Sequence, residues 1–180
     1  MPLPPLASPD FSCALCAMSY PDLSPATAAA VVRDLPDQYR AVFREVPDDV
    51  VRRRPDPSTW SMIEYACHVR DVFTVSVDRI RLALTTEDGT FEPLGNDDRA
   101  VRLRYHEAAV DETLDSLTMS AVRLADFLGT LDGGDWDRTA SRLPGEERDV
   151  RWMARQGAHE GRHHLYDIER VRQQVQADTP

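Results

Sequence analysis

The sequence predicts an all-α protein: a four-helix bundle with long connections between the second and third helices and between the third and fourth. Four long segments repeat apolar residues at three- and four-residue steps, the period of an amphipathic helix. Residues that start and stop helices frame these segments. No segment alternates apolar and polar residues with the period of two that strands show. The chain has 180 residues, of which 42% are hydrophobic, so it can form one domain with a sizeable core.

The composition divides the chain into an arm, a domain and a tail. Residues 1–23 are rich in Pro, Ala and Ser, so we expect a weakly ordered N-terminal arm. Residues 24–176 are expected to form a single helical bundle domain. Residues 177–180 are a short tail.

The first helix is predicted to start at Ser24, a good N-cap residue, with Pro25 at the first helical position. Pro36 interrupts the apolar pattern. We therefore expect the helix to kink or restart there and to continue through residues 37–46. A Pro-rich connection over residues 47–60 follows.

The second helix is predicted to open at Ser58 or Ser61. Ser61 has Glu64 three residues later, which is the spacing of a capping box. The pattern extends to residue 84, long enough for a bundle helix. Residues 85–99 are expected to form a long loop.

The third helix is predicted over residues 105–131, and Gly133 and Gly134 stop it. Its apolar repeat includes Leu114, Leu117, Val122, Leu124, Leu128 and Leu131. A second long connection over residues 135–149 leads to the last helix, which is expected over residues 150–175.

Charge and hydropathy exclude two classes of partner. The net charge of −10 opposes binding to nucleic acid, where Lys and Arg must replace counterions. The Arg run at residues 52–54 is typical of a solvated loop or helix end. No apolar run approaches the ~20 residues that cross a bilayer, and the N-terminus lacks the pattern of a secretory signal. We therefore expect a cytoplasmic protein that binds neither nucleic acid nor a membrane.

The three cysteines do not indicate a disulfide framework, because their number is odd and no secretory signal precedes them. Cys13 and Cys16 have the spacing of a metal or redox pair. They supply only two of the four ligands of a structural zinc, and no second Cys/His pair lies nearby in the sequence. We therefore expect a thiol pair on a mobile arm, with its role open. Cys67 is expected to be a core thiol.

Three of the five histidines lie in one six-residue stretch of the predicted last helix. Helical phase places them on different faces of that helix. Ile168 lies on the apolar stripe of this helix. His164 falls within about 60° of Ile168, and Glu160 falls about 80° away. His159 and His163 fall about 180° and 140° away. We therefore expect Glu160 and His164 to face the core, and the other two histidines to lie at solvent or at the rim of a site.

A buried carboxylate such as Glu160 needs a partner, because burying an unpaired charge is very unfavourable. A metal ion would satisfy Glu160 and His164 together. Gly157 and Gly161 on the same face let another helix approach closely. The alternative is a Glu–His pair at the helix edge with one member in water. His68, on an apolar stripe of the second helix, is a third ligand or a hydrogen-bonded core residue.

Two short segments resemble the DinB-like superfamily of metal-binding four-helix bundles. They are W-S-x-x-E-Y-x-x-H-x-x-D, from Trp60 to Asp71, and HEGRHHLYDI. The superfamily pattern H-x-x-H-H-x-x-[QDE]-[IV] binds metal through its first and last His. Here Glu160 occupies the first position and His164 the last. The maleylpyruvate isomerase branch is similar in using His, Glu and His, so the resemblance implies a metal site of His68, Glu160 and His164.

The resemblance also implies a function. Two imidazoles and one carboxylate suit zinc above all, and also nickel or iron. The relatives activate a low-molecular-weight thiol: mycothiol, bacillithiol or glutathione. All 21 basic residues are Arg, which favours a high-GC bacterium and hence mycothiol. The isomerases carry a further domain, so we expect a metal-dependent thiol S-transferase that acts on an electrophilic second substrate.

Two alternatives to an enzyme stay open. One is a non-catalytic, metal-stabilised binding protein associated with stress. The other is a bundle without metal, in which His68, Glu160 and His164 form a polar network. Long bundle helices often pair, so a homodimer is a further expectation.

Several residues around the site receive secondary roles. Glu64 and Asp71 flank His68, and either carboxylate is a candidate to accept a hydrogen bond from its imidazole. The alternative, for each of these residues alike, is helix capping and a surface ion pair. His163 is a candidate proton shuttle or alternative ligand. His106 is assigned to solvent or the site rim.

Overall fold

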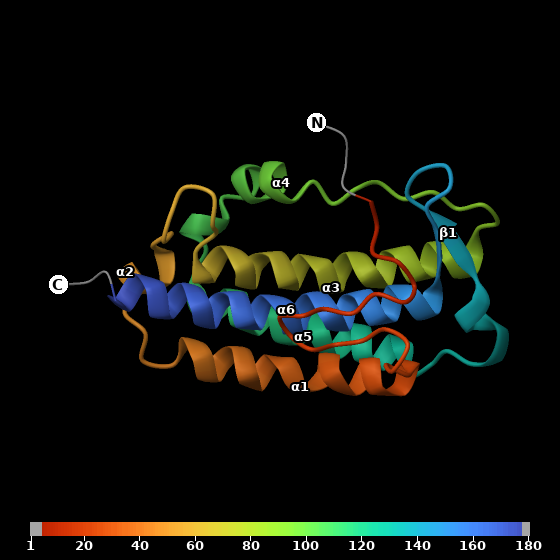
Figure 1. Cartoon of the computed structure of the whole chain (residues 1–180), viewed down its shortest axis with the longest axis horizontal. Coiled ribbons are helices and arrows are strands. Elements are labelled where there is room, and N and C mark those ends of the chain that lie inside the picture. The colour runs from red at the N-terminus through yellow and green to blue at the C-terminus, as the bar shows by residue number, and fades with distance from the viewer. Residues whose placement is uncertain (1–4, 178–180) are drawn as a thin grey trace.

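Four long helices dominate the computed structural model, which describes residues 5–177 (Figure 1). They are α1 (Pro25–Phe43), α3 (Met62–Thr85), α5 (Val110–Leu128) and α6 (Val150–Ala177). The predicted all-α four-helix bundle is confirmed, with long connections before α5 and before α6.

The four helices do not pack in sequence order. Both α1 and α3 pack against α5 and α6, so α1 and α3 lie at opposite corners of the bundle (Figure 1). Consecutive long helices are therefore not always neighbours: α3 packs against α5, but within the described residues α1 does not pack against α3. The arrangement makes α3 and α6 adjacent, and these are the two helices that carry the predicted metal ligands.

Short elements lie between the long helices. They are α2 (Asp48–Arg52), α4 (Asn96–Arg102), η1 (Tyr105–Glu107), η2 (Gly133–Asp137), β1 (Thr139–Ser141) and β2 (Glu147–Asp149). One of them, η1, occupies the predicted first turn of the third helix, which is shorter than the predicted 105–131. The two strands form one antiparallel hairpin. Strands of three residues are too short to show a period of two, so no strand was predicted here.

The two long connections meet beside α3. The backbone N–H of Phe91 donates to the carbonyl of Ser141 at 2.9 Å, and the N–H of Ser141 donates to the carbonyl of Gly89 at 2.9 Å. These bonds join the segment before α4 to the β1–β2 hairpin. The two connections, residues 86–109 and 129–149, form a wall along one side of the bundle, the wall of paired connections.

The predicted helix starts are confirmed at two places. The Ser24 hydroxyl accepts a hydrogen bond from the backbone N–H of Thr27, which makes it the N-cap of α1. Ser61 and Glu64 form the capping box of α3. By contrast, α1 does not restart at Pro36, which is buried inside a continuous helix that ends at Phe43. Packing against two other helices offsets the hydrogen bond that proline cannot donate.

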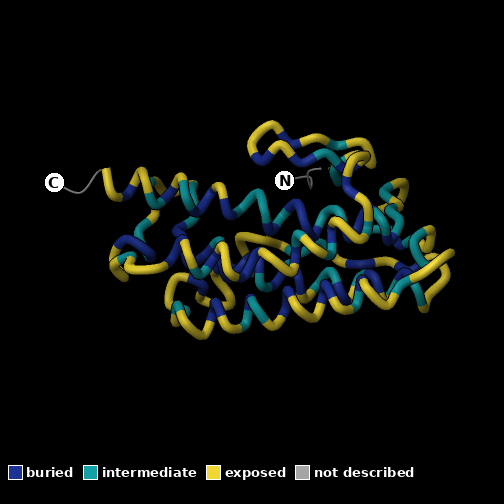
Figure 2. The backbone as a smooth tube through the Cα atoms, turned by 90° about the horizontal axis from the view of Figure 1, so that it is seen from below, coloured by how far each residue is buried: buried dark blue, intermediate teal, exposed yellow. Residues whose placement is uncertain are grey.

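The core follows the apolar stripes of the four helices (Figure 2). The predicted repeat of α5 is largely buried, with Leu114, Leu117, Leu124 and Leu128 inside. Val122 is the exception: it is 38% exposed, because it sits on the solvent side of α5 between two buried positions. Cys67 is a fully buried core thiol, as expected.

The N-terminal segment differs most from its prediction. The sequence predicts a weakly ordered arm, but residues 5–23 lie against α6, along its outward face (Figure 1). Tyr20 is fully buried, and the indole N–H of Trp152 donates to the carbonyl of Ala7 at 3.1 Å. Burial of aromatic and apolar side chains orders a segment whose composition suggests a loose chain. The remaining arm residues 1–4, and residues 178–180 of the predicted tail, lie outside the described range.

Gly161 permits the close approach of helices that the sequence predicts. A Cβ atom on Gly161 would lie 2.5 Å from Cδ1 of Leu35 and 2.7 Å from Cζ of Phe73, and both side chains are fully buried. The Gly161 carbonyl also accepts a hydrogen bond from the Tyr39 hydroxyl at 2.7 Å. Close packing at this point therefore requires a residue without a side chain.

We expect Gly161→Ala to lower the free energy of unfolding by about 1–3 kcal/mol through overpacking. Gly157→Ala is the matched control, because its nearest side-chain atoms lie at 3.3 and 3.4 Å. Alanine is the better helix former, so the control should be neutral or slightly stabilised. Urea denaturation of both variants measures the difference. Equal stabilities would contradict the packing described for Gly161.

No helix among residues 5–177 combines the length and the apolar character that a bilayer-spanning segment requires.

Candidate metal centre

Helices α3 and α6 bring three potential metal ligands together. One donor atom each from His68, Glu160 and His164 lies within 4.8 Å of the others. Oε2 of Glu160 is 3.4 Å from Nε2 of His68 and 3.2 Å from Nε2 of His164. The sequence proposed these three residues on helical phase and resemblance, and the fold places them face to face.

The donor set fits a divalent ion. His68 is only 2% exposed, and its other ring nitrogen, Nδ1, has no hydrogen-bond partner among the described residues. Glu160 is half-buried, with part of its side chain open to a pocket. Two imidazole nitrogens that converge on one carboxylate oxygen are a set that zinc and other first-row metals accept. Three protein ligands leave at least one position for another molecule.

The three groups are coupled electrostatically. Burial disfavours the charged form of Glu160, but the hydrogen bonds to His164 and His68 outweigh burial and hold the pKa of its carboxyl well below the usual range. Burial also works against protonation of His164, yet Asp167 and Glu160 raise the pKa of its imidazole to about 9. Burial lowers the pKa of His68. A strongly anionic Glu160 therefore attracts positive charge to this point.

Asp167 orients His164. Its Oδ2 lies 2.9 Å from Nδ1 of His164, and its Oδ1 accepts a hydrogen bond from Arg170 at 2.8 Å. A carboxylate on Nδ1 leaves Nε2 facing Glu160, which is the orientation a metal ligand needs. The sequence interpretation did not single out Asp167. It could have been found in the sequence, because Asp167 is the third residue after His164 and occupies the [QDE] position of the superfamily pattern.

The two carboxylates predicted to orient His68 have other partners. Glu64 accepts hydrogen bonds from Arg54 and from the backbone N–H and hydroxyl of Ser61. It is therefore a helix cap, one of the alternatives stated for it. Its neighbour on the other side of His68 is equally engaged: Asp71 bonds to Arg70, Arg99 and Tyr105.

The wall around His68 is aromatic instead. The ring of Trp60 lies 5.2 Å from the His68 ring, and the ring of Tyr65 lies 5.1 Å from the His164 ring. Packing against Trp60 and the contact with Glu160, and not Glu64 or Asp71, position the His68 imidazole.

The sequence predicts that His159 and His163 lie at solvent or at the rim of a site, and this prediction is wrong for His159. His159 is only 8% exposed, because the N-terminal segment covers the outward face of α6. His163 is partly buried, with Nε2 3.5 Å from Asp167 and Nδ1 3.4 Å from Sγ of Cys13. His106, in η1, is exposed as expected.

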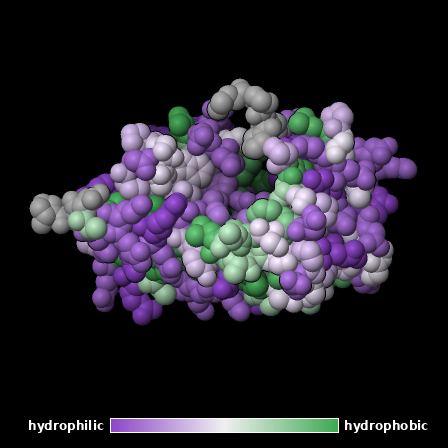
Figure 3. Space-filling model, viewed as in Figure 1, coloured by the Kyte–Doolittle hydropathy of each residue, from purple (hydrophilic) through white to green (hydrophobic). Residues whose placement is uncertain are grey.

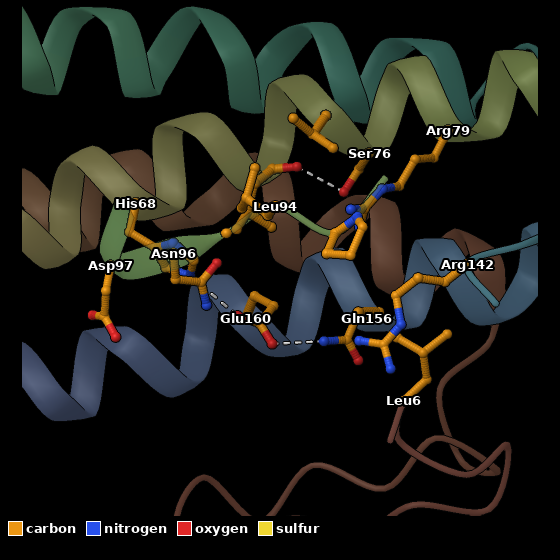
Figure 4. Close-up of a pocket in the computed structure, with 14 residues that line it drawn as sticks. Leu6, His68, Ser76, Arg79, Leu94, Asn96, Asp97, Arg142, Gln156 and Glu160 are labelled. Carbon is orange, nitrogen blue, oxygen red and sulfur yellow. Dashed lines mark hydrogen bonds and ion pairs between the residues drawn. The ribbon is translucent and has the colours of Figure 1, made fainter. Parts of the chain in front are cut away.

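A pocket of about 410 Å³ opens beside the candidate ligands (Figure 4). His68 and Glu160 line it, and Gln156 donates a hydrogen bond to Glu160 at 2.6 Å. The wall of paired connections contributes residues 93–97, and the N-terminal segment contributes Leu6. Figure 3 shows the same face of the molecule hollowed near its centre.

Two guanidinium groups lie at the other end of this pocket from His68 (Figure 4). Arg79 stacks on the ring of Phe91 at 4.4 Å and donates to the carbonyl of Glu92 at 2.9 Å. Burial, with the nearby charge of Arg142, lowers the pKa of Arg79 to about 10. Arg142 itself pairs with Glu146. This end of the pocket therefore favours an anionic group.

Comparison with known proteins relates the chain to one family. Among curated proteins, no sequence gave a significant match. The fold is similar to that of YfiT from Bacillus subtilis, described as a probable metal-dependent hydrolase with an unusual four-helix bundle topology. The TM-score is 0.76 at 16% identity, over 82% of this chain and 85% of that one. Residues 32–168 match the DinB superfamily, so the chain belongs to that superfamily, as its motifs had suggested.

Proposed function

We propose that this protein is a metal-dependent thiol S-transferase whose divalent ion is held by His68, Glu160 and His164. One observation carries the proposal: three mutually facing donor atoms lie where α3 and α6 border a pocket of about 410 Å³. Two imidazoles and a carboxylate with an open side are typical of a catalytic site and not of a closed structural one. Zinc fits this donor set best.

A divalent ion in this position would act as a Lewis acid and lower the pKa of a thiol or water beside it. Glu160 supplies the negative charge that holds the cation, and the Asp167 carboxylate fixes the ring of His164. The wall of paired connections lines the pocket beside the site. In the transfer, the thiol sulfur bonds to an electrophilic carbon, the leaving group takes its bonding pair, and the thiol proton passes to solvent.

The pocket suggests the class of both substrates. The end near Arg79 and Arg142 suits a carboxylate or another anionic group, because guanidinium groups bind such groups through charge-assisted hydrogen bonds. We propose an anionic electrophile there and a low-molecular-weight thiol beside Glu160. Mycothiol is the first candidate thiol, on the Arg-only basic composition.

A second function is favoured by the structural relative. YfiT is described as a probable metal-dependent hydrolase, and the same donor set is suited to water as the nucleophile. The two functions differ only in which small molecule attacks. A third possibility is a non-catalytic binding protein in which the metal is chiefly structural.

The test compares metal-free and zinc-loaded protein in three assays of thiol consumption, with mycothiol, bacillithiol or glutathione and monochlorobimane as the electrophile. We expect zinc to accelerate one of the three reactions, His164→Ala to lose the acceleration, and the exposed control His106→Ala to keep it. Acceleration of ester hydrolysis without any thiol would establish the hydrolase instead. No acceleration in any assay would overturn both enzymes in favour of the binding protein.

A further inference from the structure

We propose that the N-terminal segment carries a second, structural zinc site formed by Cys13, Cys16, His159 and His163. One donor atom from each of the four lies within 4.8 Å of the others. The site is separate from the centre at His68, Glu160 and His164. Its donors come from opposite ends of the chain, which explains why the sequence showed only half of it.

The donor types and spacing suit a closed zinc site. Structural zinc takes four ligands in a tetrahedron, and Cys₂His₂ is one of the common sets. The spacings C-x₂-C and H-x₃-H both fall within those that such sites use. With zinc–sulfur and zinc–nitrogen bonds of about 2.3 and 2.1 Å, ligand atoms stand about 3.3–3.8 Å apart in a tetrahedron. The four donor atoms lie within 4.8 Å of one another, so small movements of the side chains would bring them to these distances.

His159 gives an independent indication of a ligand. It is 8% exposed, and neither of its ring nitrogens has a hydrogen-bond partner among the described residues. Leaving such a group buried and unsatisfied is unfavourable, because it has lost its hydrogen bonds to water without a replacement. The rings of Phe11 and Tyr20 pack edge-on against it and cannot satisfy it. A metal bound to one nitrogen would account for a histidine buried in this way.

His163 is oriented as a zinc ligand. Its Nδ1 lies 3.4 Å from Sγ of Cys13, and its Nε2 lies 3.5 Å from a carboxylate oxygen of Asp167. Metal-binding histidines commonly place their second nitrogen against a carboxylate. The same Asp167 oxygen lies 2.9 Å from Nδ1 of His164. One carboxylate therefore supports a ligand of each centre.

The backbone of the cysteine pair forms a tight turn. The N–H of Cys13 donates to the carbonyl of Met18 at 2.9 Å, and Ser12 bridges to Ser19. The residue after the second cysteine, Ala17, has a φ of 55°, in the left-handed region that residues with a side chain seldom adopt. Both thiols are buried and point to the same place. A zinc ion there would hold this conformation.

The site would fix the N-terminal segment to α6. Leu6 lines the pocket of the first centre, and Tyr20 hydrogen-bonds Gln156, which in turn bonds to Glu160. The second zinc therefore shapes one wall of the pocket without taking part in chemistry. A free dithiol or a Cys13–Cys16 disulfide is the competing interpretation.

Cobalt substitution separates the two centres, because only the cysteine site can give a thiolate-to-cobalt charge-transfer band. We expect the cobalt form of the wild type to show this band, and zinc analysis to give two equivalents. The Cys13→Ser/Cys16→Ser variant should lose the band and one equivalent. His164→Ala should keep the band and lose the other equivalent. Cys67→Ser is the matched control, since this thiol lies outside the cluster and should leave the band intact.

Two results would overturn the proposal. One is a wild-type cobalt protein without a thiolate band. The other is a thiol titration of protein unfolded without reductant that finds one free thiol and not three, which would show a Cys13–Cys16 disulfide. If the double variant folds poorly, His159→Gln provides a second test, and it should lower zinc affinity at this site alone. Neither result depends on catalytic activity.

Discussion

Glu160→Gln is expected to lose most of the metal affinity of the His68–Glu160–His164 centre. The variant keeps the size of the side chain but removes the negative charge that lies 3.4 and 3.2 Å from the two imidazoles. Removing an outer partner of a metal ligand typically costs about 10–100-fold in affinity, so removing the charge of a ligand should cost more. Competition with a chromophoric zinc chelator at fixed pH measures the change.

The control variant for this experiment follows from the fold. On helical phase alone, His159→Ala would serve as a silent substitution, but His159 is buried within the cysteine cluster. His106→Ala is the suitable control, because its side chain is 58% exposed. Unchanged zinc affinity in Glu160→Gln would remove Glu160 from the centre, and an unchanged thiolate–cobalt band would show that the other site is intact.

Asp71→Asn is expected to be the most destabilising conservative change in the chain. The Asp71 carboxylate is buried and accepts hydrogen bonds from Arg70 at 2.7 Å, Arg99 at 2.5 Å and Tyr105 at 2.6 Å. These bonds tie α3 to α4 and η1, the elements next to the pocket wall. Breaking a buried ion pair costs about 3–5 kcal/mol, and the partial exposure of both arginines favours the lower figure.

Urea denaturation at neutral pH measures this loss, and an unchanged m-value would show that the unfolding transition itself is the same. Asp115→Asn is the matched control, because the exposed carboxylate of Asp115 pairs with a partly exposed Arg40 on the surface. Such surface pairs contribute little to stability. Similar midpoints for the two variants would contradict the role given to Asp71.

The pH dependence of the Asp71→Asn effect has a definite sign. Burial raises the pKa of Asp71, but its hydrogen bonds outweigh burial and hold the pKa below the usual 3.8. The folded state therefore binds the proton less readily than the unfolded state does. The stabilisation by Asp71 is fully present above pH ~4 and is lost as pH falls through the folded-state pKa. The stability difference between wild type and variant should accordingly shrink as the pH falls below ~4.

Much of the site could be predicted from the last helix alone. Helical phase is a local property, so the stripe through Ile168 already placed Glu160 and His164 on the inward side. The capping box at Ser61 and Glu64 also depends on residues within one turn, and the structure retains it. Where a property depends on neighbours in the sequence, the pattern of residue types was sufficient.

The partners of His68 show where that reasoning stops. Glu64 and Asp71 flank it at helical spacing, but Arg54 and Arg99 approach from other elements and engage both carboxylates. The helical spacing allowed either carboxylate to bond His68, but both bond arginines of other elements instead. Asp167, by contrast, bonds His164 within one turn and was available to a local argument.

The sequence by itself determined the four amphipathic helices, their caps and the inward direction of Glu160 and His164, because each depends on residues within a few turns of one another. The tertiary structure alone decided that α3 lies beside α6 and that residues 5–23 cover the outward face of α6. That cover buries His159 and brings Cys13 within 3.4 Å of His163, across 150 positions. Contacts between such distant residues arise from packing of whole elements, which no local period encodes.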